Sequence, residues 1–168
     1  MKIDSLDILL EEELKDLHSA EKQLLKALPK MAEKASSDEL RTAFEEHLTV
    51  TEGQVTRMEE VFEALGKTAK AKTCKAMQGL IAEGEELIKE DAGDAALICA
   101  AQKMEHYEIA SYGTLCSWAR LLDEEDVEEL LLTTLDEEKA VDQKLTELAE
   151  DTINIEAAEG EAEEEEEA

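Results

Sequence analysis

Three glutamates occupy positions of helical sequence where apolar residues are expected. Three segments carry apolar residues at alternating three- and four-residue steps, the spacing of the buried side of a bundle helix. Each series is interrupted by one carboxylate: Glu21, Glu108 and Glu138. A lone buried carboxylate is costly unless it is paired or binds a metal ion. Three helices with the same interruption therefore indicate a shared cation site inside a helix bundle.

Reflecting two antiparallel helices about their connecting turn predicts which other side chains lie at the same height along the bundle as these glutamates. Reflection about residues 36–37 sets Glu21 level with Glu52, which we expect to face outward, while Gln54 and Val50 lean inward. Reflection about residues 123–124 brings the acids of the last helix level with Glu108. The resulting candidate metal ligands are Glu21, Gln54, Glu105, Glu108, Glu138 and Asp142. For Gln54 and Glu105, hydrogen bonding to the ligands is favoured over direct binding.

The histidines and tyrosines are given other roles. His47 lies about two turns from the predicted level, roughly 10 Å along a helix. We therefore interpret His47 and His106 as surface or internally hydrogen-bonded histidines. Tyr107 and Tyr112 flank Glu108 and are expected in the core or in an interface, without a redox role.

Carboxylates on facing helices of a four-helix bundle are the ligands of di-iron and di-manganese centres. Oxygen ligands suit iron(II), manganese(II) or magnesium. The usual Glu-x-x-His pairs of such centres are absent at the predicted level. The alternative interpretation is that each acid is partly exposed and pairs with a lysine.

The elements that position these residues are all helical. Glu, Ala, Leu and Lys dominate, and aromatic residues make up only 3% of the chain. We predict helices over residues 5–35, 36–65, 73–90, 95–122 and 123–151. Two long antiparallel hairpins joined by a short crossover helix are typical of a ferritin-like four-helix bundle. The predicted domain is 1–152, followed by a disordered acidic tail over 153–168.

Local signals set the predicted helix ends. Ser36 and Glu39 have capping-box spacing, so Ser36 is the expected N-cap of the second helix. Gly66 should end that helix. Asp123 is the expected cap of the last helix, and Pro29 predicts a kink near the end of the first.

The net charge of -28, from 45 acidic and 17 basic residues, limits the classes of partner. Nucleic acids and anionic membranes need a basic surface, so neither is an expected partner. No signal peptide or membrane-spanning segment is recognised, and the three cysteines are predicted to be buried and reduced, which favours a cytoplasmic protein. The acidity is typical of a halophilic organism, where salt screens repulsion.

Residues 100–115 (AAQKMEHYEIASYGTL) closely resemble the signature of the YciE/YciF family of ferritin-like stress proteins. Shorter matches occur in the same order along most of residues 6–150; they are 19–24 (SAEKQL), 47–48 (HL), 53–55 (GQV), 74–81 (CKAMQGLI) and 134–140 (TLDEEKA). The resemblance implies a ferritin-like bundle, a homodimer, a role in stress responses and ferroxidase activity. One departure is Val50, because the family has acidic residues just after the His-Leu pair.

We therefore expect a di-iron or mononuclear carboxylate centre that oxidises iron(II) with oxygen or peroxide. The rival hypothesis is a non-enzymatic dimeric stress protein with a structural, vestigial or magnesium site. A third hypothesis is a helical adaptor that binds partners through its acidic tail.

Overall fold

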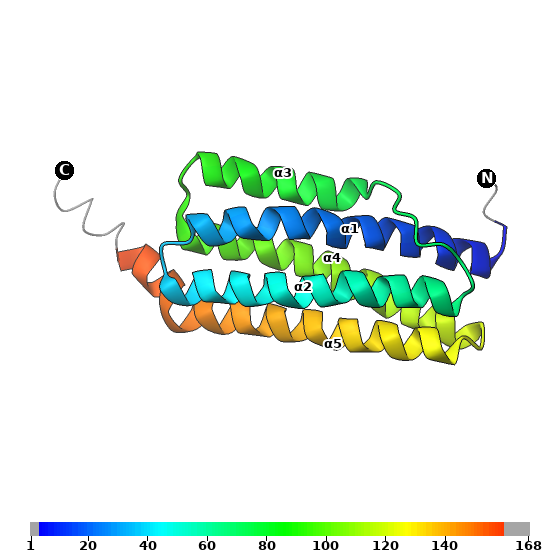
Figure 1. The fold of residues 1–168 in the computed structure, drawn as a ribbon. Helices are drawn as coiled ribbons and strands as arrows, with labels where there is room; N and C mark the ends of the chain where they lie inside the picture. The colour runs from blue at the N-terminus through cyan, green and yellow to red at the C-terminus, as the bar shows by residue number, and fades with distance from the viewer. Residues whose placement is uncertain (1–3, 160–168) are drawn as a thin grey trace.

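The computed structural model describes residues 4–159, and all regular structure in that range is helical (Figure 1). The elements are α1 (Leu6–Lys34), α2 (Asp38–Ala64), α3 (Lys75–Lys89), α4 (Gly93–Leu121), α5 (Glu125–Leu148) and a π-helical turn, η1 (Ala149–Ile153). The predicted all-α fold and its five helices are confirmed.

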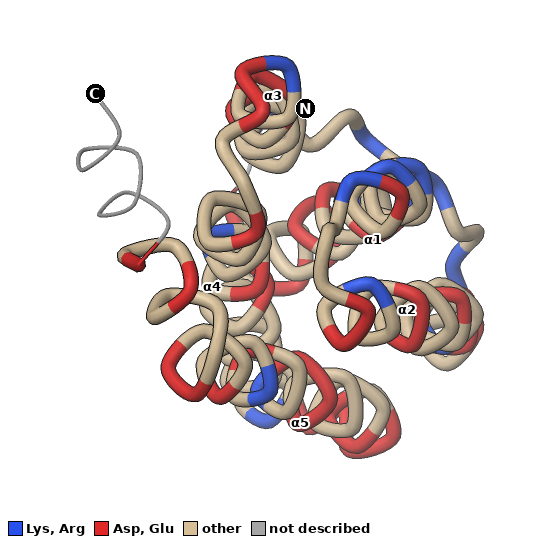
Figure 2. Tube along the Cα trace, turned by 90° about the vertical axis from the view of Figure 1, so that its left-hand side faces the viewer, with Lys and Arg blue, Asp and Glu red and all other residues tan. Residues whose placement is uncertain are grey.

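The four long helices form a bundle with a square cross-section. Viewed down the bundle, α1 lies between α2 and α4, and α5 closes the square against the same two helices (Figure 2). The crossover helix α3 lies outside the square, against α4 and α1. Each side chain on the inner face of a long helix can therefore meet side chains from the three others. This is the ferritin-like arrangement that the sequence predicts.

Two of the expected helix caps are displaced by one residue. The N-cap of α2 is Ser37, whose hydroxyl accepts a hydrogen bond from the Leu40 N–H, and not Ser36. The N-cap of α5 is Glu124, without a side-chain cap, because Asp123 adopts a left-handed backbone conformation in the turn. Gly66, also left-handed, follows the end of α2 as predicted. The chain remains helical through Pro29 to Lys34.

Hydrogen bonds between elements fix how the two hairpins meet. The Asp94 carboxylate at the start of α4 accepts from the backbone N–H groups of Ser36 and Ser37 in the α1–α2 turn, at 2.9 and 2.7 Å. The crossover is attached to α1, because the Ser19 hydroxyl accepts from the Cys74 N–H at 3.0 Å. At Gly84 of α3, an added Cβ would lie 3.5 Å from Ala100 and Met104, so α3 packs closely on α4.

The C-terminal part of the described chain differs from the prediction. Helical conformation continues through η1 to residue 159, and the Ile153 side chain is only 4% exposed. The apolar contact of η1 with α4 extends the ordered part past the predicted boundary at residue 152. Residues 160–168 of the expected disordered tail lie outside the described residues.

Two other expectations concern the cysteines and the membrane. Cys74 and Cys116 are buried as predicted, but Cys99 is exposed on α4, so the prediction of burial is wrong there. No helix within residues 4–159 combines the length and apolarity needed to cross a membrane.

Candidate metal centre

The middle of the bundle contains a layer of buried polar side chains from all four long helices, here called the acidic layer. Its members are at most 2% exposed. They are Glu21 on α1, His47 and Gln54 on α2, Glu105 and Glu108 on α4, and Glu138 on α5. Five of the six predicted ligands thus lie in this layer, and His47 joins them.

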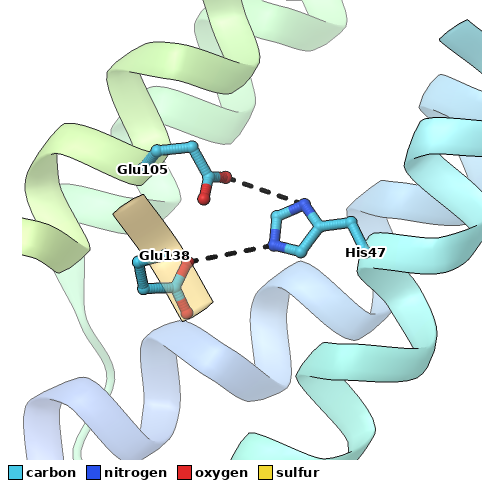
Figure 3. Close-up of side chains that lie close together, drawn as sticks. All are labelled: His47, Glu105 and Glu138. Atoms are coloured by element: carbon cyan, nitrogen blue, oxygen red, sulfur yellow. Dashed lines mark ion pairs between the residues drawn. The ribbon is translucent and has the colours of Figure 1, made fainter. Parts of the chain in front are cut away.

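His47, Glu105 and Glu138 form the tightest group in the acidic layer (Figure 3). The His47 Nδ1 atom lies 3.7 Å from Glu105 Oε1, and its Nε2 atom lies 4.0 Å from Glu138 Oε2. One donor atom from each residue falls within 4.8 Å of the other two, a separation at which one ion can be held. The interpretation of His47 as a surface or internally hydrogen-bonded histidine is therefore wrong. Its imidazole is buried and has no hydrogen-bonding partner among the described residues.

Glu21 and Glu108 form the other part of the acidic layer. The Tyr112 hydroxyl, itself buried as predicted for a core tyrosine, donates to Glu21 Oε1 at 2.5 Å. Neither oxygen of Glu108 has a hydrogen-bonding partner among residues 4–159. The charge of Glu138 raises the pKa values of Glu21, Glu105 and Glu108, so Glu138 lies near both parts of the layer.

Gln54 holds Glu138 from the α2 side. Its Nε2 atom donates to Glu138 Oε1 at 2.5 Å and to Glu137 Oε2 at 3.3 Å. Glu137 is in turn bound by the Arg57 guanidinium through two hydrogen bonds of 2.7 and 2.9 Å. This chain of contacts leads from the half-buried surface of α2 and α5 to the interior and fixes the orientation of the Glu138 carboxyl group.

Asp142 is the sixth predicted ligand, and the structure places it outside the acidic layer. Its side chain is 21% exposed; Oδ2 lies 3.1 Å from His106 Nε2, and Oδ1 accepts from the Gln102 amide at 3.1 Å. His106 is 70% exposed, in agreement with the predicted surface position. Asp142 still raises the pKa of Glu105, so its charge is felt in the layer.

Burial and neighbouring carboxylates raise the pKa values of the acids and so favour their protonated form. Burial raises the pKa values of Glu21, Glu105 and Glu108 well above the usual carboxyl range, and neighbouring carboxylates raise them further. The pKa of Glu138 rises only to about 7, because it accepts hydrogen bonds from Glu105 and Gln54 that oppose the effect of burial. Burial lowers the pKa of His47 to about 4, so its imidazole is also neutral near pH 7.

The donor set of His47, Glu105 and Glu138 could hold a metal ion. At least one buried carboxyl oxygen has no hydrogen-bonding partner in the described chain in each of Glu21, Glu105, Glu108 and Glu138. Both ring nitrogens of His47 also lack a partner there. Unsatisfied buried polar atoms are rare in native proteins and need an explanation. Four carboxyl groups with one imidazole suit iron or manganese, whereas magnesium prefers oxygen ligands alone. Strongly perturbed, clustered acids are also typical of functional sites.

The position of His47 can be recognised in the sequence from a spacing that the predicted helix phase assigned differently. The buried side of α2 runs through Leu40, Phe44, His47, Thr51, Gln54 and Met58, again in steps of four and three. The sequence-based prediction placed Leu48 and Val55 on the buried side of this helix instead, but both are only half-buried. With the correct phase, His47 and Gln54 interrupt the apolar series of α2 as the glutamates do in the other helices.

A surface pocket of about 1010 Å³ does not belong to this site. It lies between α3, α4 and the C-terminal segment, and none of the acidic-layer residues line it.

Comparisons with known proteins support the fold and identify the family of this chain. Residues 5–158 match the family described as a domain of unknown function, DUF892. The chain is 49% identical over 149 residues to protein YciF of Escherichia coli strain K12, covering 86% of this chain and 90% of that protein. The crystal structure of the Escherichia coli stress protein YciF matches with a TM-score of 0.87 and 45% identity, over 90% of this chain and 99% of that one. YcfI of Rhodopseudomonas palustris, a proposed structural protein, matches with a TM-score of 0.84 and 42% identity, over 86% of this chain and 95% of that one.

Proposed function

This chain belongs to the DUF892 family, and from that premise and the acidic layer we propose that it is a ferritin-like protein that binds and oxidises iron(II). The observation that carries the proposal is the concentration of unpaired donor atoms from four helices at one buried place. YciF of Escherichia coli, a relative, is described as a stress protein, and we extend a stress role to this chain. Iron handling is our own proposal for that role.

Iron(II) is the substrate of the proposed reaction. Two iron(II) ions would each lose one electron, and dioxygen would take up these two electrons with two protons to give hydrogen peroxide. Glu138, between the two parts of the layer, is the proposed bridging ligand. His47 and Glu105 would complete one metal position, and Glu21 and Glu108 the other. With only one position filled, the centre would be mononuclear.

The surrounding side chains prepare the site for this role. Gln54 and Tyr112 hold Glu138 and Glu21 through short hydrogen bonds, so these carboxyl groups lose little freedom when they bind an ion. Because Glu21, Glu105 and Glu108 are neutral when no ion is bound, they would release protons as their oxygens become ligands. The acidic layer lies within the apolar core, so its side chains are at most 2% exposed.

The test is element analysis of natively purified protein, followed by anaerobic iron(II) loading and an oxidation time course. We expect up to two iron or manganese ions per chain and rapid oxidation. Glu21→Leu should abolish fast oxidation without unfolding the bundle. Glu52→Leu is the matched control, because Glu52 is exposed on α2 and lies level with Glu21. Oxidation by Glu21→Leu at the wild-type rate would contradict the proposal.

A second candidate function is supported by the same hydrogen bonds. Glu21 and Glu138 each have an internal donor, and Val50 is apolar where the resembling family carries an acid. In that case the acidic layer is structural or binds magnesium, and the protein is a non-enzymatic stress protein. Absence of transition metal after anaerobic iron loading would favour this second function.

A further inference from the structure

A small pocket between α2 and α5 reaches the acidic layer from outside. Its volume is about 210 Å³, and His47 forms part of its lining. The other lining residues on the two helices are mostly apolar, and the principal ones are Ala43, Phe44, Val50, Val141 and Leu145. The pocket therefore connects the surface with a side chain that we assign to the metal site.

The charged residues that line this pocket, Glu46, Glu137 and Lys144, are all partly exposed and lie in ion pairs. Lys144 of α5 donates to Glu46 of α2 at 2.5 Å across the rim, and both side chains are about half exposed or more. Glu137, also on the rim, is held by Arg57. Exposed ion pairs of this kind contribute little to stability, so the Lys144–Glu46 contact can open and close easily.

The chemistry of the pocket selects for a neutral molecule. Apart from the partly exposed Glu46 and Glu137, which are paired with Lys144 and Arg57, the lining offers a metal ion only the His47 ring among apolar side chains, so loss of its water there is unfavourable. An uncharged diatomic molecule meets no such barrier, and apolar cavities of roughly 150 Å³ in other proteins bind xenon and similar small apolar ligands. Val50 contributes to this selection, because a carboxylate at this position would make the pocket polar.

We propose that this pocket is the access and holding site for dioxygen, next to the His47 side of the acidic layer. The inference rests on the proposed function, because it names the route of the oxidant in the same reaction. It adds that the oxidant reaches the centre between α2 and α5, and that Val50 keeps this route apolar.

Xenon is the probe for the pocket, because it measures access without iron or turnover. We expect one xenon atom per chain next to Val50 in xenon-pressurised crystals of the metal-free protein, and a saturable shift in xenon NMR. Val50→Phe should fill the pocket and lose the bound xenon. Thr49→Phe is the matched control, since it adds the same ring at the neighbouring exposed position of α2 and should leave the xenon in place.

Oxygen kinetics provide the second measurement. In Val50→Phe we expect the KM for dioxygen to rise roughly tenfold, as for other changes of shape in an apolar pocket. The kcat at saturating dioxygen and the number of iron(II) ions bound anaerobically should be unchanged. Thr49→Phe should have the wild-type KM. If Val50→Phe does not fold, Ala140→Leu on the α5 side of the pocket provides the same test.

The outcomes separate this inference from the proposed function. Rapid iron oxidation with no xenon in the pocket, or with an unchanged KM for dioxygen in both filled variants, would overturn the inference alone. Oxidation driven by peroxide but not by dioxygen would also overturn it. Bound xenon in a protein that does not oxidise iron would keep the pocket as a site for a neutral gas and would reject the proposed function.

Discussion

Along α1, Glu21 lies between Leu17 and Leu24, and all three side chains are at most 1% exposed. On α5, Glu138 lies in the same way between Leu131 and Leu145. The acidic layer and the leucine layers are therefore shielded from water to the same degree. They differ in the contacts of their side chains. The leucines pack against other apolar residues, whereas the acids have buried oxygens without hydrogen-bonding partners in the described chain.

This comparison indicates that the acidic layer is not optimised for the stability of the metal-free bundle. Buried charged or polar groups are often replaced by apolar residues with no loss of stability, or with a gain. Natural proteins keep such unfavourable groups mainly at functional sites. Substitutions in the two kinds of layer should therefore separate metal binding from stability.

The largest expected effect is on metal affinity. Glu138→Gln should lower the affinity for iron(II) at least about 100-fold, because it removes the carboxylate between both halves of the site. Leu131→Ala should cost about 2–5 kcal/mol of stability through the cavity that it leaves, with unchanged affinity per folded molecule. Anaerobic titration calorimetry with thermal unfolding measures both. Equal loss of affinity in the two variants would show that the acidic layer has no special role.

Replacing an acid by an apolar residue should stabilise the metal-free protein. Glu108 has two buried oxygens without hydrogen-bonding partners in residues 4–159, so Glu108→Leu should raise the free energy of unfolding by about 1–4 kcal/mol. The same variant should lose most of the stabilisation by iron(II). Urea unfolding with and without metal measures the two effects. A destabilised Glu108→Leu would indicate that Glu108 contributes to stability through interactions other than metal binding.

The stability of the metal-free protein should fall as the pH rises above the range where His47 titrates. Glu21, Glu105 and Glu108 have folded-state pKa values far above those of the unfolded chain, so their contribution is full at low pH and is lost as the pH rises. His47, with its folded-state pKa of about 4, acts in the opposite direction, but only below its unfolded value of 6.5. Each acid contributes to the decline between the pKa that it has in the unfolded chain and its higher pKa in the folded protein.

Thermal unfolding in high salt, which screens the surface charge, measures this decline. Glu108→Gln is the control, because it removes one ionisable carboxyl group and should make the fall of stability with pH less steep. Bound iron(II) should remove or reverse the slope, since it stabilises the ionised acids. A metal-free protein that becomes more stable as the pH rises above the range where His47 titrates would contradict the raised pKa values of these acids.

Most of the fold could be predicted from the sequence because helix periodicity, chain length and turn residues agreed. The acids Glu21, Glu108 and Glu138 were recognisable because each interrupts a long apolar series. His47 was missed for a physical reason: the acidic layer spreads along the bundle axis, whereas reflection about the turns assumes one level. The side chain of Asp142 lies against the exposed His106 and not in the acidic layer, because the level predicted for a backbone position does not specify side-chain direction.

The smallest effect is expected at Asp142. Asp142→Asn should change the iron(II) affinity less than about threefold and the stability by no more than about 0.5 kcal/mol, as for a surface substitution. Glu105 is buried in the acidic layer, so Glu105→Gln should instead weaken iron(II) binding strongly. Titration of both variants under the same conditions makes the comparison. Similar large losses would place Asp142 among the metal ligands, as the sequence predicted.

The most direct test of the acidic layer is anaerobic iron(II) titration of the metal-free protein, followed by thermal unfolding at each metal concentration. If the layer is a metal site, the wild type should bind up to two iron(II) ions per chain, and its Tm should rise with the concentration of free iron(II). Glu138→Gln should show almost no such rise. A wild-type Tm that does not change with iron(II), or that changes equally in Glu138→Gln, would contradict the account.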